Sequence, residues 1–169
     1  ILLLDQDRAL WDQFQIRQGM RALQRAHELG GAGGFYALQA AIVACHAEAT
    51  RPADTHWSRI AGLYAELMMI ANSPIIELNR AVAIGMAEGA EAALAIVDGL
   101  VQKSDLKGYH LLPSVRGDLL YRLGRFGEAR AAFEAAAALA GNKREHDLLA
   151  RRAAEAARAA MSSQFSPPV

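Results

Sequence analysis

The stretch RLGRFGEARAAFEAA, from Arg122 to Ala136, decides the fold class of this chain. It predicts a helix, a turn at the glycines Gly124 and Gly127, and a second helix composed mostly of alanine. Alanine has the highest helix propensity of all residues, and its small side chain lets neighbouring helices approach closely. The stretch therefore predicts a helical hairpin.

The same helical period extends over the rest of the sequence. Apolar residues recur at intervals of three and four, and glycine, proline or Ser-Pro separates the periodic segments. The first segment ends at GGAGG, residues 30–34, where glycine can supply a left-handed C-cap. Asp54 or Thr55 is expected to cap the third helix, while Ser73 can cap the fourth and Pro74 can begin it. The predicted helices cover residues 8–29, 35–49, 56–71, 74–87, 90–102, 110–123, 126–140 and, as a terminal cap, 144–161; residues 162–169 are expected to be a disordered tail.

The composition favours an all-α fold in one domain. The chain has 169 residues, 53% of them hydrophobic but only 7% aromatic, and alanine supplies most of the apolar excess. Eighteen Lys and Arg balance eighteen Asp and Glu, so the chain has no global positive field to hold a phosphate backbone. We therefore expect one helical-repeat module over residues 1–161 that does not bind DNA by itself.

The cysteine content and the apolar runs indicate a soluble cytoplasmic protein. Cys45 is the single cysteine, which excludes an internal disulfide and a multi-cysteine zinc site and fits a reducing compartment. It is expected to be a small core residue. The uninterrupted apolar runs fall far short of the roughly 20 residues that cross a bilayer. Because the chain begins without methionine, inside the apolar run Ile1 to Leu4, we expect it to be a fragment of a longer protein.

No catalytic, metal or cofactor site is expected. Cys45 and His46 are adjacent on a predicted helix, so their side chains diverge by about 100° and cannot act as nucleophile and base. The glycine-rich HELGGAGG follows a helix and lacks the Gly-Lys-Ser/Thr ending of a phosphate loop. Asp5 and Asp7 resemble the start of a calcium loop, but Ala9 occupies the next ligand position. The sequence thus indicates that the chain is not an enzyme, with a small-molecule-binding or enzymatic helical domain as an open alternative.

An internal repeat distinguishes between the possible kinds of helical hairpin. A shift of 36 residues aligns small residues with small ones and apolar with apolar, and such a period is typical of stacked helical hairpins. A DNA-reading helix-turn-helix fits less well, because Arg130 would occupy a buried apolar position and the second helix offers few side chains for base edges. The aligned pairs are Arg80 with Arg116, Ala81 with Gly117, Ile84 with Leu120, Ala93 with Ala129, Val97 with Phe133 and Leu100 with Ala136.

Two family resemblances rest on these residues. The pattern of Gly117, Leu120, Gly124, Ala129, Phe133 and Ala136 resembles the tetratricopeptide repeat, a helical hairpin that usually recognises other proteins. Four longer segments resemble the C-terminal extension of one group of bacterial extracytoplasmic-function sigma factors. Together they extend over nearly the whole chain, in the same order as in that group. They are LLDQDRALWD (residues 3–12), LQAAIVACHAEA (38–49), PIIELNRAVAIGMAEG (74–89) and GYHLLPSVRGDLLYRLGR (108–125).

The second resemblance implies a role in transcription initiation. Members of this group have upstream sigma domains that bind core RNA polymerase and read promoter DNA, and neither domain lies within these residues. The chain would then be a tetratricopeptide-like α-α superhelix that binds its own N-terminal sigma domains, core RNA polymerase or a regulatory protein. It would contact DNA only through the upstream domains, and would not contact a membrane. The alternative is a general peptide-binding adaptor of the same fold without a sigma role.

Candidate binding residues come from the repeat and from the resemblance. Arg80 and Arg116 are expected to lie one repeat apart on the same side, where their guanidiniums need anionic or carbonyl partners. They form either an internal clamp that ties the first segment to later helices or a site for a partner's carboxylate. Gly117, Ala81 and Ala129 are expected at close helix contacts. The other candidates are Asp5, Asp7, Arg8, Asn79, His110 and Asp118 for the clamp or partner site, with Asp118 as an acid near Arg116, and Leu78, Val82 and Tyr121 for a groove.

Overall fold

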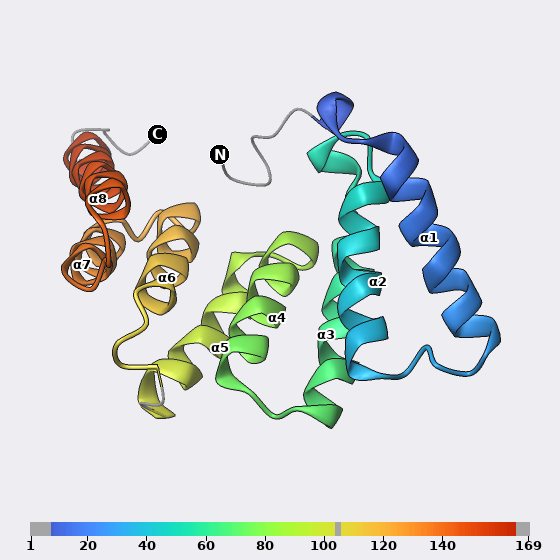
Figure 1. The fold of residues 1–169 in the computed structure, drawn as a ribbon. Coiled ribbons are helices and arrows are strands. Elements are labelled where there is room, and N and C mark those ends of the chain that lie inside the picture. Colours follow the sequence, from blue (N-terminus) through green and yellow to red (C-terminus); the bar gives the residue numbers. More distant parts are fainter. Residues whose placement is uncertain (1–7, 104–105, 165–169) are drawn as a thin grey trace. The chain divides into compact units, whose positions relative to one another are not determined.

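The computed structural model describes residues 8–103 and 106–164, and all regular secondary structure in this part of the chain is helical (Figure 1). The predicted all-α fold class is confirmed. None of the described helices combines the length and the apolar character that a membrane span requires. The α-helices are α1 (Gln13–Glu28), α2 (Phe35–Glu48), α3 (Trp57–Ile70), α4 (Pro74–Ala87), α5 (Ala90–Lys103), α6 (Leu111–Arg122), α7 (Phe126–Ala138) and α8 (Lys143–Gln164), and the short 3₁₀ helices are η2 (Arg8–Leu10) and η3 (Pro52–Asp54).

The chain divides into two compact units, which we call unit 1 (residues 1–83) and unit 2 (residues 84–169). The boundary falls within α4, between Ala83 and Ile84. Each unit holds its own set of buried apolar side chains. The single repeat module over residues 1–161 stays a prediction.

The start of α1 differs from the predicted helix of residues 8–29. Asp12 has an extended backbone, and its carboxylate accepts hydrogen bonds from the amides of Phe14 and Gln15 at 2.9 and 3.0 Å. This N-cap begins a new helix because it satisfies amides that have no partner within the first turn. At the other end of α1, Gly30 has a φ of 77°, the left-handed conformation predicted for the GGAGG segment.

The core of unit 1 lies mainly between α2 and α3. Cys45 is fully buried there, as predicted for a small core residue, and burial raises the pKa of its thiol. Trp57 and Tyr64, both on α3, pack against the same core. The buried side chains of this core are Leu38, Ile42, Cys45, Ile60, Leu67 and Ala83.

The side chains in the connection before α3 make contacts that differ from the predicted helix cap. Neither Asp54 nor Thr55 caps α3, because the N-cap residue is His56, which makes no capping bond with its side chain. Asp54 is held at 2.8 Å by Arg51, and the Thr55 hydroxyl accepts a hydrogen bond from Arg8. These two side chains therefore stabilise the connection and not the helix that follows it.

Helix α4 begins at Pro74, as predicted. Leu78 and Ala81 are 2% and 0% exposed, and residues three apart share one side of a helix. Leu78 therefore lies on the buried side of α4, and its predicted place in an open groove is wrong. Val82, the next residue after Ala81, is 36% exposed.

In unit 2, α6 packs against α7 and α7 packs against α8. Gly117 of α6 faces Phe133 of α7 so closely that a Cβ added at Gly117 would lie 2.7 Å from a ring carbon. Ala129 is fully buried on α7. The predicted close contact at Gly117 is confirmed, and Gly124 ends α6 in the left-handed conformation, with a φ of 72°.

Helix α8 is longer than predicted. It includes residues 162–164, which were expected to be disordered, and the hydroxyls of Ser162 and Ser163 donate to the carbonyls of Arg158 and Ala160. These local bonds satisfy the serine side chains within the last turns of the helix. The rest of the predicted tail lies outside the described residues.

Candidate functional site

Arg8 is a buried cation in unit 1, with 4% of its surface exposed. Its guanidinium donates to the carbonyl oxygens of His46 and Ala49, each at 2.8 Å, and to the Thr55 hydroxyl at 3.3 Å. The guanidinium carbon also lies 5.3 Å from the centre of the Trp11 ring. Arg8 thus ties η2 to the end of α2 and to the connection before α3.

His46 lies beside this cation and has a lowered pKa. Burial of the imidazole lowers the pKa, and the nearby charge of Arg8 lowers it further. The ring of Trp57 meets the imidazole edge to face, with the two ring centres 5.2 Å apart. Protonation of His46 is therefore less favourable in the folded chain than in the unfolded one.

This lowered pKa predicts that unit 1 loses stability in mild acid. Because the folded pKa lies below the unfolded value of 6.5, the contribution of His46 is present above pH 6.5 and is lost as the pH falls through the folded pKa. The wild-type chain should lose unfolding free energy between pH 7.5 and pH 5.5, and His46→Gln should lose less. The difference between the two slopes should be at most about 1.4 kcal/mol per pH unit. Urea titrations followed by tryptophan fluorescence measure the unfolding free energy at each pH. His27→Gln, which replaces an exposed histidine, is the control. An unchanged pH dependence in His46→Gln would contradict the assignment.

The structure leaves the predicted pairing of Arg80 with Arg116 open. Arg80 belongs to unit 1 and Arg116 to unit 2, so their place on a common side stays a prediction. The Nε of Arg80 is enclosed and has no hydrogen-bond partner among the described residues, and its neighbour Asn79 is exposed. Asp5 and Asp7, the expected acids of the first segment, lie outside the described residues.

Arg116 is paired within unit 2. Its Nε donates to the Asp98 carboxylate of α5 at 2.7 Å. The expected pairing of Arg116 with Asp118 is therefore wrong. Residues two positions apart on a helix are rotated by about 200° around its axis, so the side chains of Asp118 and Arg116 point to nearly opposite sides of α6. The signal available in the sequence was Asp98 itself, a single acid inside the apolar run LAIVDGLV of α5.

Asp118 instead forms an ion pair with Arg152 of α8. Burial raises the pKa of Asp118, and the charge of Arg152 opposes that rise. The Arg152 guanidinium also lies over the rings of Phe133 and Tyr121, at 4.9 and 6.0 Å from their centres. The predicted groove residue Tyr121 therefore contacts the terminal helix, and Arg152 is a residue that sequence reasoning missed.

His110 has an acidic neighbour on the same terminal helix. Its Nε2 lies 3.6 Å from the carboxylate of Glu145, in the first turn of α8. The described contacts of His110 and Asp118 thus run to α8 and not to the first segment of the chain. Neither contact belongs to the clamp that the sequence suggested.

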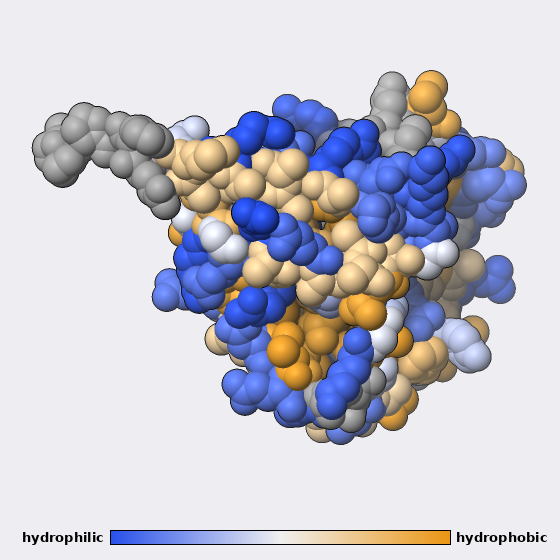
Figure 2. All heavy atoms as spheres, turned by 90° about the vertical axis from the view of Figure 1, so that its left-hand side faces the viewer, coloured by the Kyte–Doolittle hydropathy of each residue, from blue (hydrophilic) through white to orange (hydrophobic). Residues whose placement is uncertain are grey.

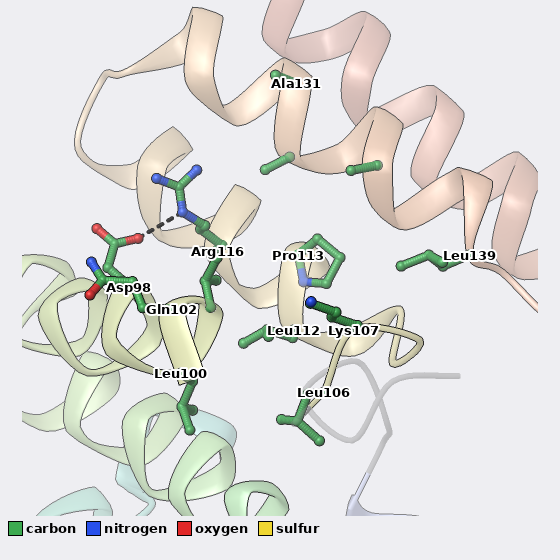
Figure 3. A pocket seen from close by; sticks show the side chains of 13 residues that line it. Asp98, Leu100, Gln102, Leu106, Lys107, Leu112, Pro113, Arg116, Ala131 and Leu139 are labelled. Atoms are coloured by element: carbon green, nitrogen blue, oxygen red, sulfur yellow. Dashed lines mark hydrogen bonds and ion pairs between the residues drawn. The ribbon is translucent and has the colours of Figure 1, made fainter. Parts of the chain in front are cut away.

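A hollow of about 700 Å³ opens between α5, α6 and α7 of unit 2 (Figure 3). We call it the α7 groove. The pair of Arg116 and Asp98 lies on one side of it and Leu139 on the other, while Pro113 and Lys107 project between them. Its apolar lining consists of Leu100, Val101, Leu106, Leu112, Pro113, Ala131, Ala132, Ala135 and Leu139.

The α7 groove continues onto exposed apolar surface. Ala131, Ala135 and Ala138 are exposed on α7, and Leu139 and Val101 remain 40% and 47% exposed. Figure 2 shows a face of the molecule on which such pale, weakly apolar side chains adjoin a strongly apolar hollow. Small side chains let another helix approach the backbone of α7 closely, so this surface suits a helical partner.

Comparison with known proteins identifies a bacterial relative. No family model matches the chain, and no solved structure matches it significantly. An uncharacterized protein of Rhizobium meliloti (strain 1021) is 46% identical over 145 residues. The match covers 86% of this chain but 34% of the relative, so the chain spans about a third of the length of the protein to which it is similar.

Proposed function

We propose that this chain is a protein-binding module of the tetratricopeptide type, and that it forms the regulatory C-terminal extension of an extracytoplasmic-function sigma factor. The observation that carries the first half is the α7 groove. It combines a mostly apolar lining, exposed alanines along one helix, and a fixed ion pair, Arg116–Asp98, at its edge. Protein interfaces commonly join such an apolar centre to a polar rim.

The contact of Gly117 with Phe133 supports the tetratricopeptide assignment. The repeat pattern has a small residue, Gly117, on the first helix of the hairpin and a large one, Phe133, on the second, and these two residues lie in contact. The buried residues Ala129 and Ala136 fit the small positions of the same pattern on α7. A hairpin of this kind buries its apolar face only against neighbouring helices, here α5 and α8.

The sigma-factor role rests on the resemblance of the four quoted segments. The Rhizobium relative is consistent with it, because about two thirds of that protein lie outside the match and leave room for further domains. In this proposal the partners are the N-terminal sigma domains, core RNA polymerase or a regulatory protein, all in the cytoplasm. DNA is contacted through the other domains, and the chain itself carries no catalytic role.

Binding to the remainder of the Rhizobium relative tests the module. We expect this chain to bind the separately purified part of the relative that lies outside the match, as measured by isothermal titration calorimetry. Ala135→Arg should weaken the binding at least tenfold, because a guanidinium would fill the α7 groove with charge. Ala40→Arg, which changes an exposed alanine of α2, is the matched control. Equal effects of both variants would contradict the groove as the binding surface.

Transcription by the relative tests the sigma role. The full-length relative should bind core RNA polymerase and start transcripts in a run-off assay on its own upstream region. Removal of the matched segment should change the amount of transcript. A relative that does not bind core polymerase would refute the sigma role. If this chain still bound peptides through the α7 groove, the general adaptor would then be the better description.

A further inference from the structure

Unit 1 contains a cavity of its own beneath α1. Helix α1 is amphipathic, yet none of its residues is fully buried. Its apolar row of Ile16, Met20 and Leu23 is only half-buried, on the side that meets α2. Between α1, α2 and α3 lies a hollow of about 600 Å³, a volume within the usual range of small-molecule sites.

The floor of this hollow is apolar and built from small side chains. It is formed by one side of α2, and Leu63 of α3 and Met20 and Leu23 of α1 extend it onto the walls. Small residues on the floor leave the space that larger side chains would fill. The floor residues are Ala37, Leu38, Ala41 and Ala44, and Glu48 at the end of α2 also lines the hollow.

The α1 wall carries basic side chains, and the α3 wall carries one acid and one base. The α1 wall presents Arg21 and His27, and Arg21 has no ion-pair partner among the described residues. The α3 wall presents Glu66, which is likewise unpaired in the described part of the chain, and Arg59, which lies 3.7 Å from Glu48. The carboxylate of a ligand is therefore favoured beside Arg21 and disfavoured beside Glu66.

Both ends of α1 are connected to α2 beside the hollow. Before the helix, Arg8 is bonded to the carbonyls of His46 and Ala49 at the end of α2. After the helix, the chain turns back at Gly30 in a left-handed conformation and enters α2. Helix α1 therefore stays beside α2 as one wall of the hollow, and the volume of the hollow suits a small ligand.

We propose that the cavity beneath α1 binds a small amphipathic carboxylic acid. Its apolar chain lies on the α2 floor around Ala41 and against Leu63, and its carboxylate accepts hydrogen bonds from the Arg21 guanidinium. The bound acid fills the space under α1 and adds contacts to a helix that otherwise buries no residue fully. This site lies in unit 1, apart from the α7 groove, and does not depend on the proposed sigma role.

Calorimetric titration of the purified chain with decanoate, decanol and decylamine tests the chemistry of the ligand. We expect decanoate to bind more tightly than decanol, and decylamine to bind more weakly than decanoate. Arg21→Gln should weaken the binding of decanoate at least tenfold, since a charge-assisted hydrogen bond is lost, and should leave the binding of decanol unchanged. Arg17→Gln, one turn earlier on α1 and outside the cavity lining, is the matched control and should change neither.

A second variant tests the position of the site. Ala41→Phe places a ring in the hollow and should abolish binding of both decanoate and decanol, while the thermal midpoint stays equal to or above that of the wild type. Absence of decanoate binding to the wild-type chain would overturn the proposal. Decanoate binding that survives Ala41→Phe in the folded protein, or that falls equally in Arg17→Gln and Arg21→Gln, would also overturn it.

Discussion

Replacing Gly117 with leucine is expected to lower the stability of unit 2 by about 3 kcal/mol. A Cβ at this position would lie 2.7 Å from the ring of Phe133, closer than side-chain atoms normally approach. The ring has little freedom to move, because Phe133 is 1% exposed and the Arg152 guanidinium lies over its face. The backbones of α6 and α7 must therefore separate, which loses packing along the hairpin.

A pair of alanine substitutions isolates this clash from helix propensity. Gly99, in the middle of α5, has no atom within 4 Å of an added Cβ, so Gly99→Ala should raise stability by about 1 kcal/mol. Gly117→Ala makes the same chemical change on α6 and should lower it. Both tryptophans lie in unit 1, so unfolding of unit 2 is followed by far-ultraviolet circular dichroism. Equal shifts for the two variants would show that the contact with Phe133 is not tight.

Replacing Arg8 with alanine is expected to destabilise unit 1 by about 3 kcal/mol. The substitution removes three hydrogen bonds and leaves the carbonyls of His46 and Ala49 without the donor that satisfies them. Arg8→Lys should recover a part of the loss, because an ammonium group cannot reach all three acceptors with the geometry of a planar guanidinium.

Tryptophan fluorescence reports this loss directly, since Trp11 and Trp57 both lie close to the contacts of Arg8 and His46. Arg17→Ala provides the control, because Arg17 is exposed and has no ion-pair partner in the described part of the chain. Its unfolding free energy should change by no more than about 0.5 kcal/mol. If Arg8→Ala unfolded at the same urea concentration as this control, Arg8 would not hold the first segment in place.

The helices could be predicted from sequence because their signals are local. The three-four period of apolar residues, together with Gly30, Pro74 and Gly124, places all α-helices of the described chain to within a few residues, apart from the start of α1. That start was misplaced because residues 8–12 continue the helical period, while the capping carboxylate of Asp12 interrupts it. A cap of this kind competes with helix continuation by a small free energy, which the period alone does not indicate.

The candidate site was harder to predict, because its contacts are tertiary. Arg8 was named as a candidate, but two of its acceptors are main-chain carbonyls, and any residue type could supply them. Asp118 was assigned to Arg116 on closeness in sequence, although the helical twist points the two side chains apart. The actual partner, Asp98, lies on another helix and becomes a neighbour only when α5 and α6 pack together.

The alanine-rich packing of α7 and α8 has a thermodynamic consequence for unit 2. An alanine side chain loses no rotamer entropy when it is buried, so its ordering is opposed by less entropy than that of leucine. It also removes little apolar area from water, and the heat capacity of unfolding scales with that area. The stability of this unit should therefore vary less steeply with temperature than that of a unit built on large aliphatic side chains. The buried alanines of these two helices are Ala129, Ala132, Ala136, Ala137, Ala153 and Ala156.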